Sequence, residues 1–202
     1  PEYIQHALGV ADFFISLERV CAHLPTGLSY LDQDRVLSLA PARPKIINPL
    51  SMPTEYRWTN GDRVKRSTVA DGVFAFTDDR DQTTKQALLF VECDGNTMPV
   101  VRSTWSQSSI LQKMLGYAAV RDHKLHKQLF GYNNFRVLFI TRDRDQRIAS
   151  MQDAWQKYVA QEIPAGAFLF ADYDELLAKS PFGDVWTNAN GEPSQLIPGY
   201  QA

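Results

Sequence analysis

The chain has 202 residues, a length that one compact domain can fill. Hydrophobic residues make up 44% and charged residues 22% of it, which provides for a core and excludes a disordered chain. The net charge of -2 excludes a strongly basic nucleic-acid coat protein and an acidic tail protein. Nucleic-acid binding would therefore require a local basic surface.

Cysteine content and terminal composition favour a cytoplasmic protein. Cys21 and Cys93 are too few for a disulfide framework or a zinc site. No apolar run approaches the ~20 residues of a membrane span, and residues 1–11 lack the layout of a signal peptide. Because the chain begins with Pro1 rather than Met, we expect an excised piece or a processed chain.

The N-terminal half predicts one helix followed by strands. Apolar residues recur every three or four positions over 6–23, which is typical of an amphipathic helix. Residues 28–53 predict irregular structure with at most one short helix near 32–38. Strand formers at 55–59 and 67–76 flank an Asn-Gly turn, and 87–92 follows as a further strand. We expect three consecutive antiparallel strands.

The C-terminal half alternates helices and strands. The pattern predicts a helix over 108–128, a strand over 135–141, a helix over 144–159 and a strand over 168–171. The tail after Pro181 is expected to wrap the outside. The complete order, αβββαβαβ, predicts an α/β fold with a mixed central sheet flanked by helices, spanning 1–202 as one domain.

Three carboxylates are candidates for a metal site. Alternation along the strand puts Glu92 and Asp94 on one face, and Asp71 lies in a neighbouring strand. Like charges this close repel unless a cation lies between them, and oxygen donors suit Mg²⁺ or Mn²⁺. The alternative, favoured by spacing alone, is that Asp71 forms a turn and the other two end a solvated strand.

A series of short motifs carries a resemblance to a known family. These motifs are Ala70-Asp71-Gly72-Val73-Phe74, the run from Phe90 to Pro99, Lys113-Met114-Leu115-Gly116-Tyr117, and the opening His6 to Glu18. Together, over residues 6–172, they resemble the replication-relaxation family of plasmid and mobile-element proteins. The resemblance implies a restriction-endonuclease-like fold of the PD-(D/E)XK type. It also implies a winged-helix DNA-binding segment upstream, which these 202 residues do not contain.

The resemblance also implies site residues. In that fold a strand aspartate and a Glu-x-Lys motif hold the metal, and Asp71 and Glu92 match them. The sequence departs at Asp94, where most such nucleases have lysine, and Lys113 could supply the positive charge instead. Glu18 could add a ligand, although a helix-surface position is the simpler interpretation.

The function implied is metal-dependent DNA nicking at the origin of a plasmid or integrative element, alongside other replication or transfer proteins. The alternative is a non-catalytic DNA-binding accessory protein on a degenerate nuclease fold, an alternative motivated by Asp94 in place of lysine. Both require DNA as the partner.

Basic residues near the carboxylates could bring DNA to the site. The candidates are Arg63, Lys65, Arg66, Lys113, Arg121, Lys124 and Lys127. A solvated helix face explains the individual residues equally well. Tyr117 follows Lys113 by four residues and shares its side of the helix, where it either packs with a phenol hydrogen bond or acts as a covalent nucleophile.

Overall fold

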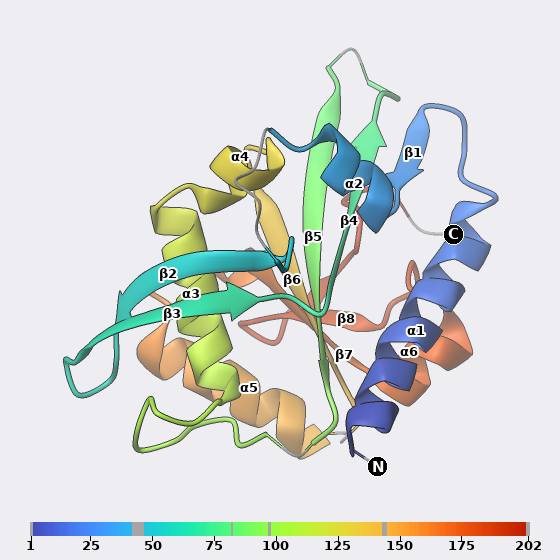
Figure 1. Ribbon diagram of the computed structural model, residues 1–202. Coiled ribbons are helices and arrows are strands. Elements are labelled where there is room, and N and C mark those ends of the chain that lie inside the picture. Colours follow the sequence, from blue (N-terminus) through green and yellow to red (C-terminus); the bar gives the residue numbers. More distant parts are fainter. Residues whose placement is uncertain (1, 42–46, 82, 97, 143–144, 201–202) are drawn as a thin grey trace.

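The computed structural model describes residues 2–41, 47–81, 83–96, 98–142 and 145–200. Figure 1 labels its helices and strands. In chain order the elements are α1 (Glu2–Cys21), β1 (Leu28–Leu31), α2 (Gln33–Leu39), β2 (Ser51–Arg57), β3 (Arg63–Val69), β4 (Gly72–Asp78), β5 (Lys85–Asp94), α3 (Ile110–Asp122), α4 (Leu125–Phe130), β6 (Phe135–Thr141), α5 (Asp145–Tyr158), η1 (Ala165–Ala167), β7 (Phe168–Asp172), α6 (Tyr173–Lys179), β8 (Trp186–Asn188) and β9 (Pro193–Ser194). Within these residues no helix is long and apolar enough to cross a membrane.

A seven-stranded sheet organises the fold, in the order β1-β4-β5-β6-β7-β8-β9. Strand β4 is antiparallel to β1 and β5, the pairs β5–β6 and β6–β7 are parallel, and β8 and β9 add antiparallel pairs. Helices α1 and α6 cover one face, while α3 and α5 lie on the other (Figure 1). The predicted α/β class, with a mixed sheet flanked by helices, is confirmed.

Each face of the sheet has its own hydrophobic core because side chains alternate along a strand. On β5, Phe90 packs into the core beneath α3 and α5, whereas Leu89 and Val91 pack into the core beneath α1. Phe13 and Leu17 of α1 are completely buried in that second core. Glu92 alternates with Phe90, so it faces α3.

The predicted strand over 67–76 is wrong as one element. It divides into β3, which pairs with β2 in a separate two-stranded sheet, and β4, which joins the main sheet. Gly72, the first residue of β4, permits the close approach of α1, since a Cβ there would lie 2.6 Å from the Phe14 ring. The three consecutive strands therefore do not form one meander, and Asp71 lies between two strands.

Other boundaries also differ. The helix predicted over 108–128 breaks into α3 and α4 because Lys124 adopts a left-handed backbone conformation, with φ of 54°. The short helix near 32–38 is confirmed as α2, but β1 was not predicted. The tail extends the sheet through β8 and β9 instead of wrapping it, and Trp186 is only 2% exposed.

Candidate functional site

Asp71 and Glu92 come together at the end of β5 because the backbone ties the two segments. The Asp71 N–H donates to the Val91 carbonyl at 3.0 Å, and Asp71 Oδ2 accepts from the Cys93 N–H at 2.9 Å. Glu92 is 1% exposed and points toward α3. A carboxylate so deeply buried requires partners.

Helix α3 supplies those partners from two positions one turn apart. Lys113 Nζ donates to Glu92 Oε2, and the Tyr117 hydroxyl donates to Glu92 Oε1 at 2.6 Å. The same ammonium lies 3.9 Å from Asp71 Oδ2. Lys113 therefore bridges the two carboxylates, and we call Asp71, Glu92, Lys113 and Tyr117 the acidic cluster.

His6 of α1 reaches the cluster from the other face of the sheet. Its Nε2 lies 3.3 Å from Asp71 Oδ1. The hydrogen bond with Asp71 raises the pKa of His6 above its ordinary value of 6.5, although burial opposes this shift. The resemblance motif contained His6, but no local pattern indicated its partner, which is 65 residues away.

The electrostatics of the cluster follow from burial and pairing. Burial raises the pKa of Glu92 to about 7, against the opposing charge of Lys113. Burial alone would raise the pKa of Asp71, but the His6 hydrogen bond and the Lys113 charge lower this pKa overall. Desolvation alone would lower the pKa of Lys113, but the charges of Glu92 and Asp71 raise this pKa overall. Lys113 therefore remains an ammonium ion at neutral pH.

Asp94 is not part of the acidic cluster, contrary to the prediction. It shares a strand face with Glu92, but Arg147 Nε of α5 lies 2.7 Å from its Oδ2 and the Thr141 hydroxyl lies 3.3 Å away. Arg147 also donates to the Met98 carbonyl. Arg147 thus neutralises the charge that a third metal ligand would supply.

The predicted set of three carboxylates around one ion is consequently not formed. Across the described ranges, no group of three or more His, Cys, Asp or Glu side chains is placed to hold a metal ion. Glu18 is exposed on α1, where it lines a surface groove of about 330 Å³ together with Asp71. The structure supports the helix-surface interpretation of Glu18.

The burial of Tyr117 decides between its two interpretations. Its side chain is 0% exposed and its hydroxyl hydrogen is donated to Glu92. Burial, and then the charge of Glu92, raise its pKa well above 10. Tyr117 supports Glu92, and the nucleophile interpretation fails because substrate has no access to the phenol.

The basic residues before Asp71 lie on the β2–β3 hairpin. Arg63 and Lys65 both pair with Glu55, at 2.5 Å and 3.4 Å. Arg66 donates to the Trp105 carbonyl at 3.3 Å and to the Ser108 hydroxyl at 3.4 Å, just before α3 begins. These contacts connect Arg66 to the segment that leads into α3, the helix that carries Lys113.

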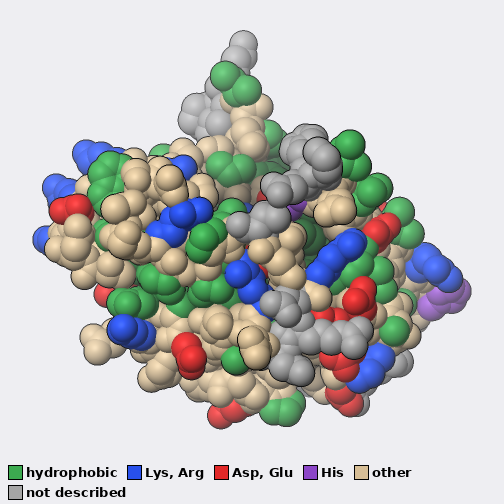
Figure 2. Space-filling view, turned by 90° about the horizontal axis from the view of Figure 1, so that it is seen from below, with side chains coloured by type: hydrophobic (Ala, Val, Ile, Leu, Met, Phe, Trp, Pro, Cys, Tyr) green, Lys and Arg blue, Asp and Glu red, His purple; other side chains and the backbone are tan. Residues whose placement is uncertain are grey.

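The other basic residues lie away from the cluster. Arg121 follows Lys113 by eight residues, about 12 Å along the helix axis, and Lys124 and Lys127 lie beyond it. Figure 2 looks onto the end of the sheet that carries the cluster, and Lys and Arg side chains are scattered there among acidic and polar ones. The predicted basic rim is therefore not a single surface.

Comparison of the chain with protein-family models, with curated proteins and with solved structures found no match.

Proposed function

We propose that this chain binds DNA of a plasmid or integrative element and nicks it by divalent-metal-dependent phosphodiester cleavage at the acidic cluster. The observation that carries the proposal is the Lys113 ammonium between Asp71 and Glu92. Two carboxylates from adjacent segments that converge on one cation supply oxygen ligands of the kind that a divalent metal ion takes.

The donor chemistry fits a small hard cation. Mg²⁺ and Mn²⁺ take oxygen ligands, and Mg²⁺ commonly uses only one or two protein carboxylates and keeps its remaining positions for water and phosphate. Asp71 and Glu92 would hold the ion, and Asp94 and Glu18 would not. When bound, the ion would polarise the phosphate and lower the pKa of a coordinated water.

The chain's own residues have separate roles in this proposal. Lys113, released from the carboxylates, would stabilise negative charge developing on the phosphate. Tyr117 holds Glu92 in place, and His6 holds Asp71. Arg66 is suited to a DNA phosphate near the start of α3.

The proposed fold type is restriction-endonuclease-like. Its support is a mixed sheet with helices on both faces, an aspartate immediately before one strand and a glutamate within the adjacent antiparallel strand. Lys113, on the following helix, takes the place of the lysine that the strand lacks at Asp94.

One observation favours the second candidate, a non-catalytic DNA-binding accessory protein. All four oxygens of Asp71 and Glu92 already have partners within the chain: His6, the Cys93 N–H, Tyr117 and Lys113. In that case the Lys113 bridge serves stability alone.

Relaxation of supercoiled plasmid, with Mg²⁺, Mn²⁺ or a chelator, tests the proposal. Nicking that requires metal and is lost in Asp71→Asn, Glu92→Gln and Lys113→Met supports the enzyme. The matched control is Asp153→Asn, an exposed carboxylate of α5, which should retain wild-type nicking. If the protein binds DNA that carries the element's origin in a salt-dependent way but does not nick it, the accessory function is assigned instead.

A further inference from the structure

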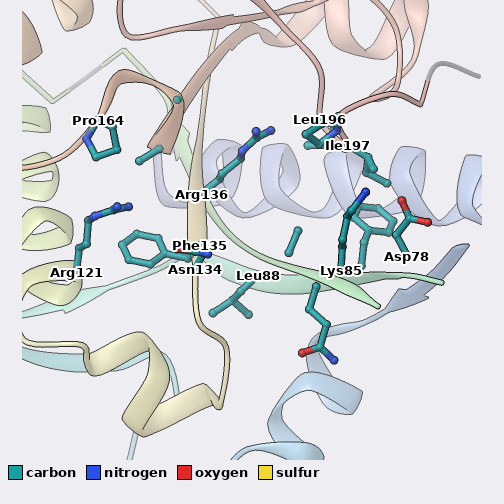
Figure 3. Close-up of a pocket in the computed structure, with 16 residues that line it drawn as sticks. Asp78, Lys85, Leu88, Arg121, Asn134, Phe135, Arg136, Pro164, Leu196 and Ile197 are labelled. Atoms are coloured by element: carbon teal, nitrogen blue, oxygen red, sulfur yellow. The ribbon is translucent and has the colours of Figure 1, made fainter. Parts of the chain in front are cut away.

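A pocket of about 470 Å³ lies at the end of the main sheet opposite the acidic cluster (Figure 3). It is lined by the starts of β5 and β6, including Leu88 and Phe135, whereas Glu92 lies near the end of β5. The buried side chains of Phe76, Leu196 and Ile197 give it further apolar surface. Its volume is within the range of small-molecule sites, about 300–1,000 Å³.

Two arginines reach this pocket from different elements. Arg121 comes from the end of α3, and Arg136 comes from β6 (Figure 3). Arg136 alternates with Phe135 and Val137, which belong to the core beneath α3, so it leaves the opposite face of the sheet. The two side chains thus line one pocket from opposite faces of the sheet.

Neither guanidinium has a counter-charge in the part of the chain that the structure describes. Arg136 Nη1 donates to the Gln195 backbone carbonyl at 2.8 Å, and no carboxylate lies within 4 Å of Arg136 or Arg121 among those residues. The other charged groups of the pocket are paired. Asp78 is held by Arg80 at 2.8 Å, and Lys85 by Asp81 at 2.5 Å.

A partly buried guanidinium without an anion is unfavourable, because it loses hydration without a compensating charge. Consistent with this, burial lowers the pKa of Arg136. Four of its N–H donors have no protein acceptor among the described residues. A planar guanidinium matches the two oxygens of a carboxylate or a phosphate.

We propose that this pocket binds a small organic anion, with its carboxylate or phosphate group on Arg121 and Arg136 and its apolar body against the aromatic and aliphatic wall. The site is independent of the acidic cluster, so it stands whether or not the chain cleaves DNA. It also gives Arg121 a partner other than DNA.

Isothermal titration of the whole chain with matched naphthyl probes tests the proposal. The probes are 2-naphthoate, 2-naphthyl phosphate, neutral 2-naphthalenemethanol and inorganic phosphate. We expect at least one naphthyl anion to bind with millimolar or better affinity, and the neutral alcohol and inorganic phosphate to bind at least about tenfold more weakly. The tighter of the two anions identifies the preferred head group.

Variants identify the arginines as the anion site. Arg121→Met and Arg136→Met should each weaken binding by about tenfold or more, whereas Arg35→Met, an exposed arginine of α2, should have no effect. Arg121→Lys should be intermediate, since it keeps the charge but loses the planar donors. Thermal unfolding of each variant verifies that it folds.

Three results would overturn the proposal. The first is that neither naphthyl anion gives a heat of binding at concentrations of several millimolar. The second is that the neutral alcohol binds as tightly as the anions. The third is that Arg121→Met binds the anions as tightly as the wild type. If Arg121→Met instead weakens only duplex-DNA binding, Arg121 is a DNA contact and the pocket is not an anion site.

Discussion

The hydroxyl of Tyr117 donates to Glu92 Oε1 at 2.6 Å, and both residues are buried, with at most 1% of their surface exposed. This hydrogen bond and the Lys113 ion pair together give each oxygen of the buried Glu92 carboxylate a partner. Both partners of Glu92 come from α3, the helix that also packs over the core on that face of the sheet.

Tyr117→Phe should lower the free energy of unfolding by about 1–3 kcal/mol, because Glu92 Oε1 would lose its donor while remaining buried. Urea unfolding measures the change. Tyr30→Phe is the matched control, since the buried Tyr30 hydroxyl has no hydrogen-bond partner among the residues that the structure describes, and its removal should be neutral or stabilising. Equal losses in both variants would contradict a special role for the Tyr117 hydrogen bond.

The raised pKa of Glu92 predicts a pH-dependent stability. Between its ordinary value of 4.5 and about 7, the folded protein keeps a proton on Glu92 that the unfolded chain has released. The free energy of unfolding therefore falls as the pH rises through this window. His6, whose pKa is also raised, acts in the same direction, since its stabilisation is lost as the pH rises through its folded pKa. The lowered pKa of Asp71 acts only at more acidic pH.

Glu92→Gln isolates the contribution of Glu92, because His6 and Asp71 are present in both proteins. The stability of the wild type relative to Glu92→Gln should fall by roughly 1–3 kcal/mol between pH 4.5 and 7.5. Urea unfolding across this range provides the measurement. A difference that does not change with pH would mean that Glu92 is ionised throughout.

The Asp94–Arg147 pair should behave as a buried structural ion pair. Asp94→Asn and Arg147→Met should each destabilise the fold by about 3–5 kcal/mol, because each leaves a buried charge without its partner. The double variant should lose less than the sum of the two. A double-mutant cycle measures this coupling, and the exposed Lys179–Glu175 pair, expected to couple by about 0.3–0.5 kcal/mol, is the control.

Gly72→Ala should destabilise the protein by roughly 1–3 kcal/mol, since the new Cβ would meet the Phe14 ring at 2.6 Å. Gly95→Ala is the matched control, because a Cβ there meets no atom of the described part of the chain within 4 Å. Thermal or urea unfolding distinguishes them. A Gly72→Ala protein as stable as Gly95→Ala would show that α1 can shift away from the sheet without loss.

The local sequence pattern was sufficient to predict the helices and strands whose first and last residues do not depend on pairing with distant segments. The mainly apolar run over 135–141 corresponds to β6, and the alternation that put Glu92 on the face of Phe90 is observed. Each of these follows from backbone geometry within a few residues. The strand expected over 67–76 failed because its two halves pair with different strands, β2 and β5, which no local period records.

The amino-acid sequence by itself determined the α/β class, because strand alternation and helical spacing are set by covalent geometry. It also indicated Asp71, Glu92 and Lys113 as candidate site residues. Only the tertiary structure decided which charges meet. Asp94 leaves the strand on the same side as Glu92 but is neutralised by Arg147, which is 53 residues away, and His6 reaches Asp71 across 65 residues. Such pairings depend on which helix covers which face of the sheet, and that choice is made by the packing of the whole core.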